Sequence, residues 1–474
     1  MKSYKYIFLS VLFLGLFACE DELNIDPQQS LSTDLAFSNE QASLGSLMGV
    51  YSRTQDLEVF GSMPQIIADY QSDNVSFIGS FPTLQDVNNF VTLSDNSSIE
   101  TIWRDNYRAI FAANAVIKNV PDVDDPGFSA EEKAQYVAEA KFVRSYYVFF
   151  QMANLFGDPY TLDNGASLAI PMVLDPFEGD VTFPERATVK QIYDQIKTDL
   201  VAAEADLPET HGSDLALTLG RATKGSANAL LSRIALYTED WQGAADYADK
   251  VINSSVYQLA AGYNFYSQNT PEEVFSLQNS ATDNGRTGSG GWASFYNPAE
   301  AGARGDCPFS QDLLDAYAEE AGDKRFSDLT QVGANEATYT TKFPDPVNNS
   351  DNVPLIRITE MYLNRAEALA ELNGVNQASV DLINDLRDRA GLADWTTGQF
   401  GSNDAFLDAI ANERRKELAF EGHRRMDLLR RGLALRPADD PKMEDSMPGK
   451  PKTILPVPQR EVDLNQSLVQ NDGY

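Results

Sequence analysis

The sequence predicts an all-α fold in which a helical scaffold carries a large, irregular, loop-rich half. Apolar residues recur at helical spacing over most of the chain, whereas the alternation typical of strands is short and scattered. Two long stretches, about residues 70–97 and 256–305, lack a helical period and are rich in Ser, Asn, Gly and aromatic residues. With 474 residues, 43% of them hydrophobic, the chain can bury a large core.

The helical spacing places amphipathic helices along the whole folded part of the chain. The expected ranges are Glu40–Val59, Ser98–Val120, Ala130–Phe156, Val189–Leu207, Lys224–Thr238, Gln242–Asn253, Ser310–Glu319, Ile358–Leu372, Gln377–Ala390 and Asp404–Phe420. Two neighbouring pairs, Gly225–Tyr237 with Ala244–Asn253 and Thr359–Glu371 with Gln377–Arg389, have the pattern of tetratricopeptide-type helix pairs. They do not repeat in tandem, so we expect a scaffold with insertions; unrelated helices in an all-α enzyme are the alternative.

The first residues have the layout of a secretory signal peptide. Lys2 and Lys5 precede a short apolar run, and Leu16-Phe17-Ala18-Cys19 resembles the lipobox at which bacteria acylate a cysteine. The run is too short to cross a membrane well. We therefore expect a signal peptide over 1–18, a lipidated (palmitate-bearing) Cys19 that begins a flexible tether over 19–32, and one folded domain over 33–474. A plain signal peptide with an incidental cysteine is the alternative.

Charge and composition exclude several classes of function. Seventy acidic residues against 37 basic ones give a formal net charge of −33, so the positive surface that nucleic-acid binding needs is missing. With two Cys and two His, a Cys/His zinc site is not expected. Asp122, Asp124 and Asp125 could hold a structural calcium, but the remaining ligands of a calcium loop are lacking. No cofactor is predicted.

The sequence carries no nucleophile, metalloprotease or phosphate-binding motif. His211 lies in a polar loop and His423 at a charged helix end, so both are expected to be structural or solvated. Among catalytic options, this leaves a pair of carboxylates of the kind that glycosidases use. With 70 acidic residues, spacing alone does not select such a pair.

Aromatic and polar residues gather in the two irregular stretches, where we expect any ligand site. Sugar rings stack on aromatic faces, and their hydroxyls bond to carboxylates, amides and guanidinium groups. The candidate glycan-binding residues are Asp73, Asn74, Phe77 and Phe81 in the first stretch and Trp292, Phe295, Tyr296 and Arg304 in the second. Together they would form a shallow, exposed platform. The alternative is that the rings fill small hydrophobic clusters under long loops.

The strongest pattern lies near the C-terminus, in the run Glu413-Arg-Arg-Lys-Glu-Leu-Ala-Phe-Glu-Gly-His-Arg-Arg-Met-Asp-Leu-Leu-Arg-Arg-Gly432. Leu418 and Phe420 can pack inward, and Glu417 and Glu421 are in reach of nearby arginines at i,i+3 or i,i+4 spacing. This run closely resembles the C-terminal signature of the SusD/RagB family of Bacteroidetes outer-membrane lipoproteins. The segments 140–147, 155–159, 357–368 and 455–474 also resemble family segments, although Asp472 stands where proline is usual.

The resemblance implies a SusD-like tetratricopeptide-type fold, no catalysis, and a lipid-anchored position at the cell surface, on the outer membrane. The acidic run Glu20-Asp21-Glu22 after Cys19 resembles the surface-export signal of such lipoproteins. The implied function is capture of oligosaccharide or polysaccharide and its delivery to a TonB-dependent, SusC-like transporter. The negative charge favours a neutral glycan over a polyanionic one. Peptide cargo and a lipid-anchored glycoside hydrolase are the alternatives.

Overall fold

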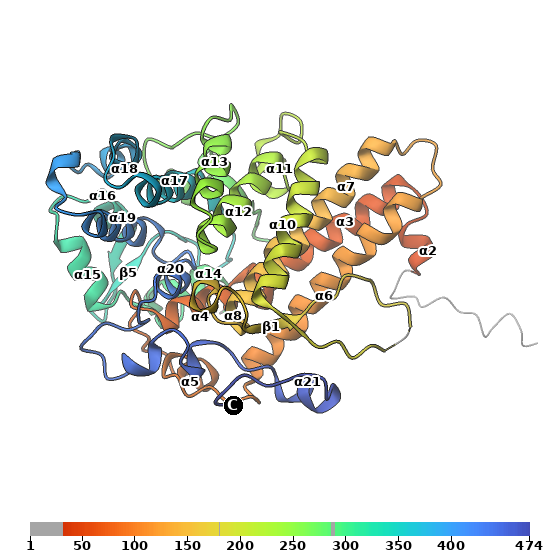
Figure 1. The fold of residues 1–474 in the computed structure, drawn as a ribbon, viewed down its shortest axis with the longest axis horizontal. Helices are drawn as coiled ribbons and strands as arrows, with labels where there is room; N and C mark the ends of the chain where they lie inside the picture. The colour runs from red at the N-terminus through yellow and green to blue at the C-terminus, as the bar shows by residue number, and fades with distance from the viewer. Residues whose placement is uncertain (1–31, 180, 286–289) are drawn as a thin grey trace, which may run out of the picture.

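The computed structural model describes residues 32–179, 181–285 and 290–474. In this part of the chain the fold is predominantly helical, and the predicted all-α, SusD-like class is confirmed (Figure 1). The expected signal peptide and nearly all of the tether, including Cys19, lie outside the described residues. None of the described helices is both long and apolar enough to cross a membrane.

The helices cover most of the described sequence. Their bounds are α2 Thr33–Ala36, α3 Glu40–Thr54, α4 Met63–Gln71, α5 Pro82–Asn88, α6 Ser97–Asn119, α7 Ala130–Val143, α8 Gln151–Phe156, α9 Tyr160–Asp163, α10 Val189–Asp206, α11 Leu215–Gly220, α12 Lys224–Tyr237, α13 Trp241–Ile252, α14 Trp292–Tyr296, α15 Gln311–Ala318, α16 Lys324–Leu329, α17 Ile358–Asn373, α18 Gln377–Ala390, α19 Asn403–Leu418, α20 Arg424–Arg430 and α21 Gln459–Leu464.

The strands that the structure describes are short and form antiparallel pairs only. They are β1 Leu168–Pro171 with β2 Arg186–Thr188, β3 Glu273–Leu277 with β6 Val353–Arg357, and β4 Thr330–Val332 with β5 Thr338–Thr340. In the central pair, Glu273 stands opposite Arg357 and Leu277 opposite Val353, and all residues of both strands are buried. The pair β3–β6 therefore belongs to the core, against α12 and α17.

The scaffold is a row of packed helices in the order α3, α6, α7, α10, α12, α13, α17 and α18, with α19 also packed against α17. In Figure 1 this row runs from the orange helices on the right to the blue helices on the left. Both predicted helix pairs are present, as α12–α13 and α17–α18, and they pack directly on one another through α13 and α17. The tetratricopeptide-type arrangement predicted from the sequence is therefore confirmed, without a regular tandem repeat.

Local sequence explains where the helices begin. The Ser129 hydroxyl accepts from the Glu132 N–H, while the Glu132 carboxylate accepts from the Ser129 N–H, which forms a capping box before α7. Thr188 and Gln191 form the same motif before α10. The turn between α12 and α13 uses Glu239 at a φ of 58°, a conformation that shortens the connection between the two helices.

Two long predicted helices are interrupted. The range Glu40–Val59 ends as an α-helix at Thr54 and continues as a π-helical turn over Leu57–Gly61, and Ala130–Phe156 is divided by a π-helical segment over Arg144–Phe150. The first irregular stretch contains the short helix α5, and the second contains β3 and α14. Helical spacing alone does not reveal such interruptions, because a π turn keeps most of the apolar pattern.

The C-terminal signature run is buried, and its carboxylates bind cations from distant parts of the chain. Glu417 contacts Arg389 at 2.8 Å and Arg357 at 3.4 Å, while Glu421 contacts Lys342 at 2.6 Å and Arg357 at 2.9 Å. Burial acts to raise the pKa of Glu421, but Arg357 and Lys342 lower it to about 2. The expected pairing of Glu417 and Glu421 with arginines of the same run is therefore wrong. The helix α19 ends at Leu418, and both carboxylates turn into the core, where they meet cations from other parts of the chain.

Candidate functional site

The two irregular stretches of the sequence meet in space, next to the helical scaffold. The backbone N–H of Ser76 donates to the carbonyl of Pro308 and that of Ile78 to the carbonyl of Asp306, each at 3.0 Å. Val75 and Phe309 form an antiparallel bridge in the same segment. Residues 75–78 and 306–309 therefore run side by side like two strands, and the surface above them is built from both stretches.

A buried layer lies beneath this contact. The Tyr296 hydroxyl, from α14, donates to the carboxylate of Asp69 on α4. Beside it, the thiol of Cys307 lies 3.5 Å from the Tyr70 hydroxyl, and burial raises the pKa of this thiol. Burial also raises the pKa of Asp69 to about 7, because the hydrogen bond from Tyr296 and the charge of Lys342 compensate the burial only in part. These contacts join α4 to the segment after α14.

Asp73 and Asn74, both predicted to bind glycan, are held by the signature run. Arg424 contacts the two carboxylate oxygens of Asp73 through Nε and Nη2, each at 2.7 Å. Arg415 donates through Nε to Oδ1 of Asn74 at 2.8 Å. Burial acts to raise the pKa of Asp73, but its hydrogen bonds and ion pair with Arg424 lower it. Both predicted residues are buried, and the Asp73 carboxylate and the Asn74 side-chain oxygen are already bound by arginines of the protein.

Trp292, Phe295 and Tyr296 lie in the core, so the expected exposed platform is not formed by these rings. Trp292 is 4% exposed and Tyr296 is fully buried. The indole N–H of Trp292 donates to the carbonyl of Phe60 at 3.0 Å, and its ring packs on Phe343. The sequence pattern did not distinguish exposed from buried rings, because Trp and Tyr pack in cores when their polar atoms find a partner.

The other three predicted residues lie at or near the surface. Phe81 is 47% exposed, and the Arg304 guanidinium carbon lies 5.7 Å from the centre of its ring. Arg304 also covers the buried ring of Phe295 at 4.7 Å, and its Nε pairs with Asp306 at 2.6 Å. Phe77 is half-buried against Tyr70, with 4.3 Å between ring centres. A smaller aromatic surface, of Phe77 and Phe81 with Arg304, is therefore present.

An open cleft of about 470 Å³ borders Phe77. We call it the loop cleft; its lining residues are Asp73, Val75, Ser76, Phe77, Asn88, Asn89, Ser310, Gln311, Asp312, Asp315, Arg436, Pro437, Asp439, Asp440, Pro441 and Lys442. Its size falls in the range of small-ligand sites, and its walls present many carboxylate, amide and hydroxyl groups. Three parts of the chain build it: the first irregular stretch, α15 and the loop after α20.

The loop after α20 was not among the predicted site residues. Arg436 fixes it to the first stretch, because its Nη2 donates to the carbonyls of Tyr70 and Asn88 at 2.7 and 2.9 Å. Asp439, Asp440 and Lys442 follow on the same loop and line the loop cleft. The only sequence signal was the run Arg436-Pro-Ala-Asp-Asp-Pro-Lys442, which is typical of a loop but does not reveal where that loop packs.

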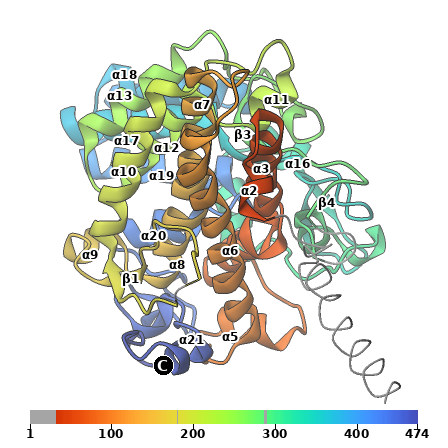
Figure 2. The same ribbon diagram turned by 90° about the vertical axis from the view of Figure 1, so that its right-hand side faces the viewer.

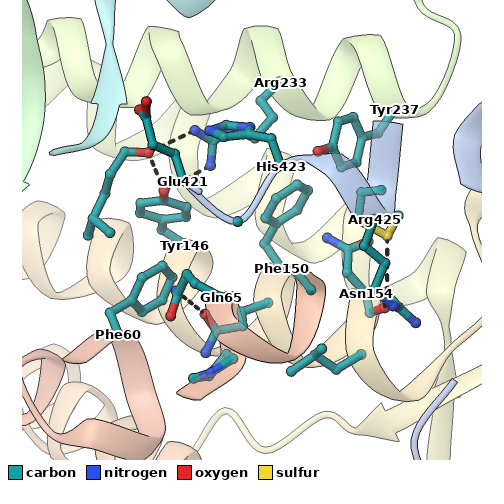
Figure 3. Close-up of a pocket in the computed structure, with 17 residues that line it drawn as sticks. Phe60, Gln65, Tyr146, Phe150, Asn154, Arg233, Tyr237, Glu421, His423 and Arg425 are labelled. Carbon is teal, nitrogen blue, oxygen red and sulfur yellow. Dashed lines mark hydrogen bonds between the residues drawn. The ribbon is translucent and has the colours of Figure 1, made fainter. Parts of the chain in front are cut away.

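A second, smaller cavity lies under the signature run (Figure 3). It measures about 80 Å³ and lies among Gln65, Tyr146, Phe150, His423 and Arg425. This volume accommodates water molecules but is well below the ~300 Å³ from which small-molecule sites usually begin. Burial lowers the pKa of His423 to about 4, so its imidazole is neutral at physiological pH. We regard this cavity as part of the core.

Carboxyl groups with a raised pKa occur, but they do not face one another in the loop cleft. Asp69 accepts a hydrogen bond from Tyr296. Glu273 is the first residue of β3, and its carboxylate accepts from the backbone N–H of Thr270; burial raises its pKa to about 8. Neither residue lines the loop cleft. In the described chain, no group of three or more His, Cys, Asp or Glu side chains is arranged to hold a metal ion; Asp125 instead accepts from the backbone of Glu40 and Gly127.

Fold and site together define a tetratricopeptide-type helical scaffold that presents an open polar cleft on its loop-rich half. A family model described as "SusD family" matches residues 337–474, and one described as "Starch-binding associating with outer membrane" matches residues 23–236. The chain belongs to the SusD/RagB family.

Individual relatives agree with this assignment. The SusD-like protein P25 of Formosa agariphila is 25% identical, over 100% of this chain and 99% of the relative. The crystal structure of a SusD superfamily protein from Bacteroides thetaiotaomicron superposes with a TM-score of 0.81 at 27% identity, covering 91% of this chain and 99% of the other. A laminarin-binding SusD-like protein superposes with a TM-score of 0.75 at 25% identity, over 92% of this chain and 100% of the other.

Proposed function

We propose that this protein is a cell-surface glycan-binding lipoprotein that captures an oligosaccharide or polysaccharide in the loop cleft and on the adjoining faces of Phe77 and Phe81. The observation that carries the proposal is the junction of the two irregular stretches, which places the half-buried ring of Phe77 at an open polar cleft and the exposed ring of Phe81 beside Arg304. The descriptions of the matching family model, which names starch, and of the laminarin-binding neighbour support it.

The chemistry of this surface suits a neutral sugar. The exposed Phe81 ring and the half-buried Phe77 ring offer apolar faces for the C–H side of a pyranose. The carboxylates of Asp315 and Asp439 at the cleft wall can accept hydrogen bonds from sugar hydroxyls. Because the chain has a net charge of −33 and the cleft is lined by several carboxylates, a uronate polymer would be repelled.

The protein would hold its ligand without cleaving it. The lipobox-like Leu16-Phe17-Ala18-Cys19 supports an anchor at Cys19 in the outer membrane, facing the exterior of the cell. Family membership supports a TonB-dependent, SusC-like transporter as the partner that receives the glycan. The roles of Asn74, Trp292, Phe295 and Tyr296 would then be indirect, through the shape of the site. Phe77, Phe81 and Arg304 would face the ligand, and Asp73 would border it at the wall of the loop cleft.

Isothermal titration of residues 20–474 with maltohexaose, laminarihexaose and a uronate oligosaccharide tests the proposal. We expect a neutral glucan to bind and the variant Phe81→Ala to bind it about tenfold more weakly, a loss of ~1–2 kcal/mol. Phe177→Ala, at a 64% exposed ring on the loop between β1 and β2, is the matched control and should bind normally.

Three results would overturn the proposal. Equal binding by Phe81→Ala and Phe177→Ala would place the ligand elsewhere. Release of new reducing ends from the bound glycan would show an enzyme. Binding of a peptide mixture in place of every glycan would support the peptide-cargo alternative.

A further inference from the structure

A second open cleft lies on the helical scaffold and shares no lining residue with the loop cleft. It measures about 410 Å³ and lies between the α12–α13 turn, the end of α17, α9 and the end of α20. All of these helices are labelled in Figure 2. We call it the scaffold cleft. Its lining residues are Thr161, Leu162, Leu236, Glu239, Trp241, Glu367, Glu371, Leu429, Arg430, Arg431, Gly432 and Pro448.

Trp241 is the aromatic residue of this cleft. It is the first residue of α13 and is half-buried, so part of its ring remains open to the cleft. Among the described residues no acceptor is found for its indole N–H. Leu162, which is 48% exposed, is another apolar side chain of the lining. This side of the cleft therefore combines a flat ring with an unused hydrogen-bond donor.

Carboxylates line the same cleft. Glu367 is tied to Arg430 by contacts of 2.5 and 2.8 Å. In contrast, the carboxylates of Glu239 and Glu371 show no hydrogen bond or ion pair within the described residues. The pKa of Glu371 is raised, first by partial burial and then by the charges of Glu367 and Glu239, so these groups share one space. The cleft thus offers hydrogen-bond acceptors that the fold itself does not use.

Guanidinium groups complete the lining but are already held in place. Arg431 contacts Asp408 at 2.7 Å, and Arg430 is fixed by Glu367. The hydroxyl of Thr161 donates to the carbonyl of Arg430 at 2.9 Å. The framework of the cleft is therefore ordered before any ligand enters, which lowers the entropic cost of binding.

We infer that the scaffold cleft is a second carbohydrate-contact site, which takes a neutral pyranose ring on Trp241 with its hydroxyls bonded to Glu239 and Glu371. The inference rests on the proposed glycan-binding function and extends it to a second surface. A ring of this size fits the cleft volume, and the unpaired carboxylates disfavour an acidic sugar. Two separate contacts on one polysaccharide would raise the avidity of the protein for long chains over short ones.

Fluorine NMR of protein labelled with 5-fluorotryptophan tests the inference directly. The chain has four tryptophans: Trp103 and Trp292 are each 4% exposed, whereas Trp241 and Trp395 are half-buried. The variant Trp241→Phe therefore assigns the Trp241 signal, and the Trp395 signal, from a ring packed on Phe400, is the internal reference. We expect maltohexaose or laminarihexaose to shift the Trp241 resonance in the wild type and also in Phe81→Ala. Glu371→Ala, an exposed position that should not disturb folding, should weaken this response about fivefold.

The two sites fail independently in this experiment. If no neutral glucan shifts the Trp241 resonance, the inferred carbohydrate site in the scaffold cleft is overturned. This holds whether or not Phe81→Ala changes binding in titration. A shift that disappears in Phe81→Ala also overturns it, because the signal would then report on the loop cleft. If the shift persists in Phe81→Ala and that variant also binds glucan normally in titration, glycan binding at the scaffold cleft is retained. Glycan binding at the loop cleft is then rejected.

Discussion

The guanidinium group of Arg424 holds both carboxylate oxygens of Asp73, with Nε–Oδ1 and Nη2–Oδ2 distances of 2.7 Å. Arg424 begins α20 in the signature run, and Asp73 follows α4 at the start of the first irregular stretch. The pair therefore ties the most recognisable segment of the sequence to the loop that shapes the proposed site. An arginine of the signature run and a candidate ligand residue are thus the two partners of one ion pair.

Removing Arg424 should destabilise the protein. Arg424→Ala leaves the buried carboxylate of Asp73 with only Arg415, at 3.5 Å, as a cation, and such changes cost ~3–5 kcal/mol of unfolding free energy. Urea unfolding measures the loss. The exposed pair Lys190–Asp194 is the control: Lys190→Ala should cost less than ~0.5 kcal/mol. If Arg424→Ala and Lys190→Ala lowered the unfolding free energy by the same small amount, the buried ion pair would contribute little to stability.

Trp292→Ala should act on stability first. The ring is buried among Phe343, Tyr296 and the Phe60 backbone, so its removal leaves a large cavity and a loss of ~3–5 kcal/mol. Thermal unfolding measures this, with Phe111→Ala, 39% exposed on α6, as a control with a much smaller effect. A variant that melts like the wild type but no longer binds glycan would instead show a direct contact with the ligand.

The pH dependence of stability should carry the signature of Asp69. Its pKa is raised in the folded state from 3.8 to about 7, so the folded protein binds a proton more tightly than the unfolded chain. The contribution is complete only below the unfolded-state pKa of 3.8 and is lost as the pH rises to about 7, by roughly 4 kcal/mol at ~1.4 kcal/mol per pKa unit. The difference in unfolding free energy between wild type and Asp69→Asn should fall over this range.

His423 should act in the opposite direction, which gives an internal check. Its pKa is lowered from 6.5 to about 4, so its contribution is present above pH 6.5 and is lost as the pH falls towards 4. As the pH falls from 6.5 towards 4, the unfolding free energy of His423→Gln should therefore decrease less than that of the wild type. The exposed Asp34→Asn controls for the loss of one surface charge. If the unfolding free energies of Asp69→Asn, His423→Gln, Asp34→Asn and the wild type changed in parallel with pH, both pKa assignments would be contradicted.

Membrane attachment should depend on one residue. Cys19→Ala removes the thiol that the lipobox-like segment presents for acylation, so the full-length protein should leave the membrane fraction. Cell fractionation measures this, and mass spectrometry of the wild type should find acyl chains on the first residue of the mature protein. Cys307→Ala, at the other cysteine, should remain with membranes. Equal fractionation of both variants would remove Cys19 as the anchor.

The helical scaffold was largely predictable because its signal is local. The pairs α12–α13 and α17–α18 follow from apolar spacing and from turn residues such as Gly374, which has a φ of 69°. The interruption at Arg144–Phe150 was not predictable, since a single wide turn hardly alters the apolar pattern. That the irregular stretches carry the ligand site stays a prediction, and the sequence did not reveal how the segments pair with each other.

The candidate site was predictable only in part, because burial is a tertiary property. Phe81 and Trp292 have similar loop-rich surroundings in sequence, yet one ring is 47% exposed and the other 4%. The difference comes from Phe343 and the Phe60 carbonyl, neither of which lies near Trp292 in the sequence. Arg436 and Asp439 were missed for the same reason, since their loop reaches the site from the far end of the chain.

The buried thiol at the junction of the two irregular stretches offers a built-in reporter of motion. If Cys19 is acylated, Cys307 is the single cysteine left free to react, and its side chain is fully enclosed beside Tyr70. Separation of residues 75–78 from residues 306–309 would expose it to an alkylating reagent. The rate of thiol modification would therefore report how often the two segments open, and a bound sugar that bridges them should lower this rate.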